Sequence, residues 1–206
     1  MITLYERTDC PFCWKVRIAL AELGVEHHIE ATRLGEKHPE VTRLSPTGTV
    51  PVLVDGDTAI WESAVILEYL DSRYGPGQLF PGTPAEQASV RLLHAYSDKI
   101  VGGCLRDLVF EKRSKREADW DGEIIAASSD KWWNCQVSLE QQLAGRPWFG
   151  QDYSAADCAL AARFGVAEAY GAPVTPEFPA LSAWYAKVKD RPSWQRAYPG
   201  SFIRTE

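Results

Sequence analysis

The first part of the chain alternates short β-type runs with one stretch of helical spacing. Residues 2–5 and residues 25–31 carry the β-branched and apolar side chains that are typical of short strands. Between them, apolar side chains recur every three or four positions from Pro11, which suits a first helical turn, to Gly24, which suits a helix end. Because this connection can hold a crossover helix, the two strands are predicted to run parallel in one mixed sheet.

A hairpin and a second helix follow. Residues 32–49 are mostly polar and contain two prolines, so they predict a loop with at most one helical turn. Residues 50–54 and 58–61 are β-rich runs joined by Asp55-Gly56-Asp57, which is a hairpin turn signal. Residues 63–74 then carry one apolar helical stripe. The predicted order is therefore β, α, β, loop, β, β, α.

Beyond the glycines and prolines of residues 75–84, the patterning is helical throughout. Ser154 and Asp157 form a capping-box pattern, with Tyr153 and Cys158 placed for a hydrophobic staple. The predicted helices cover residues 87–108, 124–143, 154–170 and 179–190, with a last one from residue 193. The second part is thus expected to be all-helical.

Charge and hydropathy exclude several classes of function. The 206 residues include 22 Lys and Arg against 28 Asp and Glu, and the net charge of -6 has the wrong sign for binding a phosphate backbone, so no nucleic-acid partner is expected. No apolar run approaches the roughly 20 residues that span a bilayer, so no membrane partner is expected either. The N-terminus shows no export signal, which favours a cytoplasmic location.

The strongest local signal is the run Cys10-Pro11-Phe12-Cys13, which joins the first predicted strand to the first predicted helix. Helix N-terminal amides stabilise a thiolate and lower a thiol pKa to roughly 3.5–7.5 in such motifs. Lys15 and Arg17 add positive charge nearby. Cys10 is therefore expected to be the reactive thiol, with Cys13 as the resolving thiol that attacks a mixed disulfide on Cys10.

Two alternatives for this pair are an inert buried pair and half of a zinc site. No second Cys or His pair follows at ligand spacing, so no metal site is expected. The strand-to-helix position favours redox or nucleophilic use. The odd total of five cysteines in a reducing compartment argues against a disulfide framework, and Cys104, Cys135 and Cys158 are expected to be packed as small apolar residues.

Two weaker signals lie further along the chain. Pro51 opens a strand after a turn, which suggests a tight bond, cis or trans, at a strand edge that leaves the Val50 backbone able to pair with an extended peptide. Glu62 and Ser63 begin a helix, where a carboxylate and a hydroxyl beside free amides could bind an amine and a carboxylate together. Both residues are also ordinary at a helix start.

Taken in order, these motifs resemble those of the soluble glutathione S-transferase superfamily. The resemblance rests on Cys10 to Cys13 with Arg17, on the run from Val50 to Leu53, on Glu62-Ser63, and on the Ser154 capping box. It implies an α/β thioredoxin-like N-terminal domain and an all-α C-terminal domain. The implied boundaries are residues 1–77 for the thioredoxin-like, glutathione-binding domain, 78–84 for a linker, and 85–206 for the helical domain.

The resemblance also implies a site for glutathione as co-substrate. Cys10 would face its sulfur near Phe12, and Val50 would pair with its cysteinyl backbone beside cis-Pro51, while Glu62 and Ser63 would hold the γ-glutamyl end. Many family members have Lys or Gln just before the Val-Pro pair, where this chain has Thr49. Lys37 or His38 could replace that partner of a glutathione carboxylate. The hydroxyls of Tyr5 and Thr8 are less well placed than Cys10.

A cysteine at the catalytic position resembles the omega, beta and glutaredoxin-like branches. The expected function is therefore a transferase of the redox type, a glutathione-dependent thiol transferase or a disulfide or dehydroascorbate reductase that uses the Cys10 thiolate. Two alternatives stay open. One is a transferase that conjugates glutathione to electrophiles, and the other is a non-catalytic adaptor of the stringent starvation protein type, which typically lacks the first-turn cysteine.

The helical domain would supply a pocket for a small hydrophobic or disulfide co-substrate. Five aromatic residues offer apolar surface for it or for core and dimer packing, namely Tyr96, Trp120, Trp132, Trp133 and Tyr170. Arg91 and His94 could also face the cleft. The resemblance further implies a two-fold homodimer.

Overall fold

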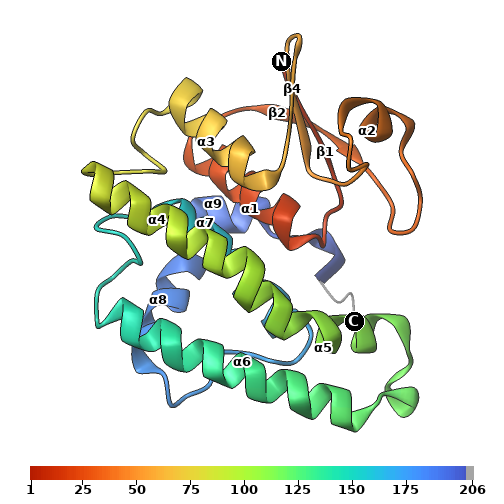
Figure 1. The fold of residues 1–206 in the computed structure, drawn as a ribbon, viewed down its shortest axis with the longest axis vertical. Helices are drawn as coiled ribbons and strands as arrows, with labels where there is room; N and C mark the ends of the chain where they lie inside the picture. Colours follow the sequence, from red (N-terminus) through yellow and green to blue (C-terminus); the bar gives the residue numbers. More distant parts are fainter. Residues whose placement is uncertain (203–206) are drawn as a thin grey trace.

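The computed structural model describes residues 1–202, and the last four residues of the predicted helical domain, 203–206, lie outside the described residues. The first part of the chain contains four strands and three helices (Figure 1). In chain order they are β1 (Ile2–Glu6), α1 (Pro11–Glu22), β2 (His27–Ala31), α2 (Pro39–Leu44), β3 (Val52–Asp55), β4 (Thr58–Trp61) and α3 (Ser63–Tyr74). The predicted order of elements is confirmed, and the polar loop holds α2.

The four strands form one mixed sheet in the order β2-β1-β3-β4. β1 is parallel to β2, with Leu4 opposite Ile29, and antiparallel to β3, with Leu4 opposite Leu53. β3 and β4 form the predicted hairpin, in which Asp55 pairs with Thr58. The parallel pair arises because α1 carries the chain back to the starting edge, as the length of the connection predicted.

The remainder of the described chain is helical (Figure 1). Its longer elements are α4 (Pro84–Tyr96), α5 (Gly102–Ser114), α6 (Gly122–Leu143), α7 (Ala155–Ala169), α8 (Pro179–Lys189) and α9 (Pro192–Ala197). Three short helical segments complete it, a π-helical segment at Ser97–Val101 and 3₁₀ turns at Glu117–Asp119 and Gly200–Phe202. A thioredoxin-like sheet domain followed by a helical region is thus the fold, as predicted.

The helix predicted at residues 87–108 is longer and less regular than its pattern indicated. It begins at Pro84, where Thr83 and Glu86 form a capping box, and continues to Ser114 with the π-helical segment inserted after Tyr96. A π-helical turn keeps the hydrogen-bonded winding of a helix and adds about one residue, so it leaves little trace in hydrophobic spacing.

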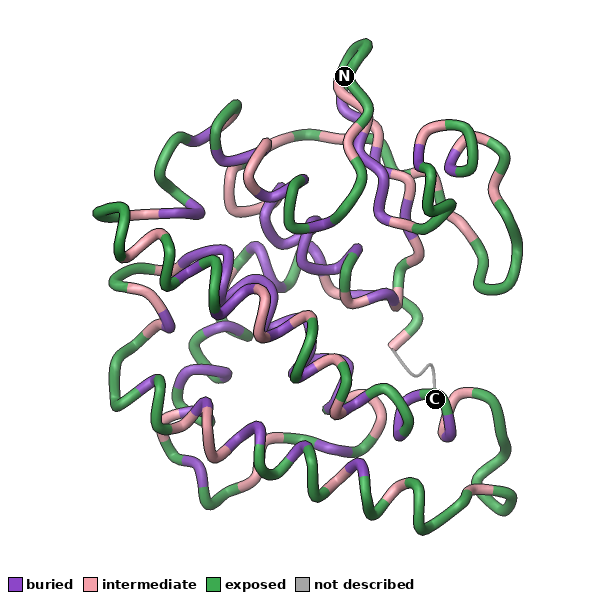
Figure 2. The backbone as a smooth tube through the Cα atoms, in the orientation of Figure 1, coloured by how far each residue is buried: buried purple, intermediate pink, exposed green. Residues whose placement is uncertain are grey.

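α1 lies between the sheet and the helical region. Its residues Cys13 to Leu20 are all buried, because one face meets α3 while the other packs on α7 and α9. α7 is buried in the same way over residues 155–167 (Figure 2). Helices that are buried on all sides lose the one-sided stripe of a surface helix, and these two form the centre of the molecule.

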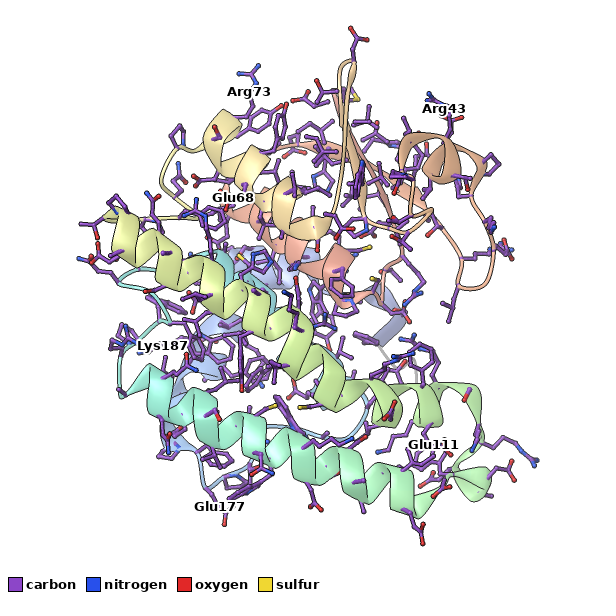
Figure 3. The ribbon with its side chains drawn as sticks, in the orientation of Figure 1. Arg43, Glu68, Arg73, Glu111, Glu177 and Lys187 are labelled. Carbon is purple, nitrogen blue, oxygen red and sulfur yellow. The ribbon has the colours of Figure 1, made fainter. Side chains whose placement is uncertain are left out.

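Buried hydrogen bonds hold the start of α7 in the helical region and join it to the segment that follows α3. The Ser154 capping box is confirmed, and the Asp157 carboxylate accepts hydrogen bonds from the Ser154 N–H at 3.0 Å and the Trp184 indole N–H at 2.9 Å. The N–H of Ala155, at the first residue of α7, donates to the carbonyl of Leu79 at 2.8 Å. On the surface, Glu68 of α3 accepts hydrogen bonds from Arg91 of α4 (Figure 3).

Hydropathy sets one further limit on the fold. Within residues 1–202, none of the helices is both long enough and apolar enough to cross a membrane.

Candidate active site

A cavity of about 760 Å³ lies where the first part of the chain meets the helical region. The thioredoxin-like side contributes the start of α1, the loop before α2, and the turns that lead into β3 and α3. The helical side contributes residues of the π-helical segment, α5 and α7. Its volume falls in the range of cavities that bind small molecules.

Cys10 lies on the wall of this cavity, at the N-cap of α1. Cys10 is only 6% exposed, although it is one of the residues that line the cavity. The pKa of Cys10 is lowered from 9.0 to about 6, mainly because the Cys13 thiol donates a hydrogen bond to its sulfur. Burial opposes this shift, while the backbone N–H groups of Cys13 and Phe12 and the charge of Arg7 support it. A thiolate is therefore the favoured form at neutral pH.

Cys13 lies one turn further along α1 and is fully buried. Its pKa is raised well above 9.0 by burial and by the neighbouring Cys10 sulfur. The two thiols thus differ in kind, since Cys10 is poised as an anion and Cys13 as a neutral hydrogen-bond donor.

We expect alkylation of Cys10 by iodoacetamide to reach half its maximal rate near pH 6, because only the thiolate reacts and the pKa of Cys10 is about 6. In Cys13→Ala the main stabilising hydrogen bond is lost, so the midpoint should move toward 9, whereas Cys13→Ser keeps a donor and should stay closer to the wild type. Peptide mass spectrometry identifies the labelled cysteine. A wild-type midpoint near 9 would contradict the structure.

Several residues singled out in the sequence meet at this cavity. Phe12, Val50, Pro51, Glu62 and Ser63 all line it together with Cys10. The Val50–Pro51 peptide bond is cis. Tyr5 and Thr8, the alternative hydroxyls, are not among the lining residues.

Glu62 has an unusual backbone. Its φ of 67° lies in the left-handed region that residues other than glycine rarely adopt, and it directly precedes buried Ser63 at the start of α3. Such conformations persist where the surrounding structure holds them and are concentrated at functional sites. Glu62 and Ser63 thus both line the cavity at the N-terminal end of α3.

Lys37 and His38 were the two candidates to replace the Lys or Gln that many family members have before Val50, and the structure places them differently. His38 lines the cavity at the N-cap of α2, with its ring edge-on to Tyr5 at 5.4 Å. Its Nδ1 is buried and has no hydrogen-bond partner within the described residues. Lys37 is exposed and is not among the residues that line the cavity. His38 is thus the better placed of the two.

Lys15 and Arg17, the two cations expected near Cys10, both have acidic partners of their own. Lys15 Nζ lies 2.6 Å from both His94 Nε2 and an Asp98 oxygen, and burial lowers the pKa of Lys15 to about 8. Arg17 forms a buried ion pair with Glu6. Arg7, which precedes the motif, contributes to the low pKa of Cys10, and the charge of Lys15 also interacts with that of Cys10.

The structure separates the five aromatic residues, which were candidates for the pocket or for packing, from this cavity. None of Tyr96, Trp120, Trp132, Trp133 and Tyr170 lines it. Trp132 is buried against Phe164, and its indole N–H donates to the carbonyl of Ala172. Trp132 thus belongs to the helical core, where burial of a large aromatic side chain stabilises the fold, whereas Trp133 is 44% exposed.

Arg91 and His94 do not reach the cavity either. Arg91 pairs with Glu68 on the outer surface of α3 and α4 (Figure 3). His94 is buried against Lys15, and its pKa is lowered to about 4, mainly by burial. The sequence alone could not orient α4 about its axis, so it offered both residues only as candidates for the cleft.

The helical wall of the cavity is basic instead. Lys99, Arg106, Arg113 and Arg163 line it, with apolar surface from Phe110 and its neighbours. The first three recur at intervals of seven residues, which places them on one face of a helix, and this spacing is the signal that sequence reasoning missed. Arg163 gives no such signal, because its direction depends on how α7 packs.

Residues 4–78 match the protein family described as "Glutathione S-transferase, N-terminal domain". FtsZ-localized protein A of Caulobacter vibrioides is 31% identical over 202 residues, covering 94% of this chain and 89% of that protein. Glutathione S-transferase GstB of Escherichia coli is 28% identical, with 94% and 95% covered. A stringent starvation protein A homolog of Coxiella burnetii is 28% identical, with 78% and 73% covered.

Solved structures agree with these relatives. The theta class glutathione S-transferase from Xanthomonas axonopodis pv. citri, with glutathione bound, matches with a TM-score of 0.86 at 29% identity, over 98% of this chain and 99% of that one. Three findings point to one family. They are the fold, the match of residues 4–78, and a relative that is 31% identical along nearly the whole chain. The chain belongs to the glutathione S-transferase family.

Proposed function

We propose that this protein is a glutathione-dependent thiol transferase that reduces disulfides, or dehydroascorbate, through the Cys10 thiolate. The observation that carries the proposal is a cysteine at a helix N-terminus, with a pKa near 6, facing a cavity shared with a cis-proline turn and the start of α3. A structure neighbour binds glutathione, and this supports glutathione as the co-substrate here.

The proposed reaction has two thiol–disulfide exchanges. The Cys10 thiolate attacks the glutathione sulfur of a mixed disulfide, so that a Cys10–glutathione disulfide forms and the second thiol leaves. The thiolate of a second glutathione then attacks that disulfide, which releases glutathione disulfide and restores the Cys10 thiolate. The net change converts one mixed disulfide and one glutathione into one thiol and one glutathione disulfide.

Cys13 could replace the second glutathione as the attacking thiol in the last step. Its full burial and raised pKa favour the monothiol route, in which Cys13 only donates a hydrogen bond to the Cys10 sulfur. The leaving Cys10 sulfur is stabilised by the same donor in either route.

The other residues that line the cavity on the thioredoxin-like side are assigned to binding glutathione. Beside Pro51, the backbone of Val50 pairs with the cysteinyl backbone of glutathione. Glu62 and Ser63 hold the γ-glutamyl end. His38 binds a glutathione carboxylate in place of the Lys or Gln of other family members. Residues 1–77 form the glutathione-binding domain, 78–84 the linker and 85–206 the domain that faces the co-substrate. The chain acts as a homodimer in the reducing cytoplasm.

Two other functions are supported by relatives. The likeness to GstB supports conjugation of glutathione to electrophiles, with Cys10 as a hydrogen-bond donor. The likeness to FtsZ-localized protein A and to a stringent starvation protein A homolog supports a binding role without turnover. Cys10 with its lowered pKa favours the thiol transferase over both.

A comparison of two activities separates these functions. Wild-type protein is assayed with glutathione and either bis(2-hydroxyethyl) disulfide or chlorodinitrobenzene, and its retention on immobilised glutathione is measured in parallel. We expect disulfide reduction to be the faster reaction and the protein to be retained. Faster conjugation would favour the conjugating transferase. A protein that is not retained on immobilised glutathione and turns over neither substrate would favour the adaptor.

A further inference from the structure

Arg163 stands at the wall of the cavity with an unused hydrogen-bond donor. It is 7% exposed and comes from α7, the central helix of the molecule. Its Nη2 is buried and has no hydrogen-bond partner within the described residues, since the nearest carboxylate oxygen, Asp98 Oδ1, is 3.6 Å away. A buried, charged N–H group without an acceptor is costly, so a built site for an acceptor is indicated.

The guanidinium of Arg163 is held in one orientation. Its Cζ lies 4.4 Å from the centre of the Phe12 ring, a cation–π contact. On another side, a Cβ added to Gly102 would lie 2.8 Å from the same Cζ, so the backbone of α5 approaches it as closely as glycine allows. The π-helical segment directly before Gly102 carries Asp98 and Lys99, and both line the cavity. The group is thus preorganised rather than mobile.

More positive charge surrounds this group on the helical side. Lys99 and Arg106 are exposed in the cavity and form no ion pair with any carboxylate among residues 1–202. Arg113 pairs with Asp9 at 2.9 Å. Asp98, the acidic residue on the same wall, is shared between Lys15 at 2.6 Å and Arg163 at 3.6 Å. The helical wall therefore carries an excess of positive charge.

We propose that the second substrate carries a carboxylate, which Arg163 binds at the cavity wall while Lys99 and Arg106 attract it from the rim. A planar guanidinium matches the two oxygens of a carboxylate. Apolar surface from Leu105, Val109 and Phe110 lines the same wall and suits a short hydrocarbon chain attached to that carboxylate. The substrate class is thus a disulfide with a carboxylate a few bonds from the sulfurs.

The inference rests on the proposed function only in that the substrate is taken to be a disulfide. The carboxylate-binding site itself does not depend on the reaction. The residues proposed to hold glutathione come from α1 and from the turns before β3 and α3, whereas Arg163, Lys99 and Arg106 come from the helical region. The two groups can therefore be tested separately.

The kinetic test compares two disulfides with the same two-carbon arms and different end groups. Bis(2-hydroxyethyl) disulfide is neutral, and 3,3′-dithiodipropionate carries a carboxylate at each end. We expect wild-type kcat/KM to be roughly tenfold higher for the dicarboxylate, as one additional hydrogen bond to a charged group would give. The ratio should fall toward one in Arg163→Gln, fall partly in Lys99→Gln and Arg106→Gln, and stay unchanged in Arg91→Gln, whose arginine lies outside the cavity.

A binding test needs no turnover. Calorimetry with octanedioate, the unreactive carbon analogue of dithiodipropionate, should show binding to the wild type that weakens as salt rises, and 1,6-hexanediol should not bind. Arg163→Gln should lose the octanedioate signal, and Lys99→Gln and Arg106→Gln should weaken it. Because these two variants change surface residues, they keep the test available if Arg163→Gln fails to fold. A separate titration with S-methylglutathione reports on the glutathione site.

The outcomes separate the two proposals. Binding of octanedioate without binding of S-methylglutathione would support the carboxylate site and overturn the proposed function. Equal kcat/KM for the two disulfides, together with no salt-sensitive binding of octanedioate in a protein that binds S-methylglutathione, would overturn the carboxylate site alone.

Discussion

Replacing Cys10 with serine is expected to reduce kcat/KM for glutathione-dependent reduction of bis(2-hydroxyethyl) disulfide by at least about 100-fold. The Cys10 sulfur is the atom that forms and breaks bonds in the proposed reaction, and its pKa of about 6 makes it an anion at neutral pH. A serine hydroxyl in the same place stays protonated and cannot form the mixed disulfide. Steady-state kinetics with glutathione and the disulfide measure the loss.

Cys104→Ser is the matched control for this variant. Cys104 lies on α5 with its sulfur 2.9 Å from that of Cys135, and it is not among the residues that line the cavity. The control should therefore keep its disulfide reductase activity. Full activity of Cys10→Ser would refute the thiolate mechanism, whereas lost reduction with retained conjugation of chlorodinitrobenzene would show that both reactions use one glutathione site.

The reactive cysteine could be found from sequence because its signals are local. A strand that ends before Cys10 and a proline that begins the next helix place the thiol at a helix N-terminus whatever the rest of the chain does. The position of Ser63 at the start of α3 depends on neighbouring residues in the same way, whereas the cis bond before Pro51 was implied only by the family resemblance. Local patterns therefore predicted the sheet, the hairpin and the thioredoxin-like half of the cavity.

The helical half was predicted less well because its chemistry depends on the rotation of helices. Hydrophobic spacing shows that residues 87–108 are helical, but it does not show that His94 packs on Lys15 while Lys99 and Arg106 face the cavity. The π-helical segment changes the rotation of α5 relative to α4, and its sequence gives no signal for this. Arg163 was missed because buried arginines are rare and depend on partners from other helices.

The cavity and the core are coupled through the packing of α1 on α7. Trp14 is fully buried one turn after Cys10 and stacks on Trp194 with their ring centres 4.6 Å apart. Gly165 of α7 faces this pair of rings, so that the absence of a side chain there lets the two helices approach. The position of the α1 N-terminus, and hence of Cys10, depends on this contact.

Replacing Gly165 with alanine is expected to lower the free energy of unfolding by about 1–3 kcal/mol, the usual cost of overpacking a core. An added Cβ would lie 2.6 Å from Trp14 Cζ3 and 2.7 Å from Trp194 Cη2, and neither ring has free space to move into. Alanine raises helix propensity by up to about 1 kcal/mol, so the clash must exceed this gain. Chemical denaturation followed by tryptophan fluorescence and circular dichroism measures the change.

Gly103→Ala isolates the clash from the helix propensity. Gly103 is also helical, in α5, but an added Cβ there meets no atom within 4 Å. This variant should gain about 0.5–1 kcal/mol, because alanine restricts the unfolded chain without strain in the folded one. Equal gains in both variants would show that Trp14 and Trp194 can yield at no cost. A loss confined to Gly165→Ala would show that the α1–α7 contact is rigid, which is what a fixed position for the Cys10 thiolate requires.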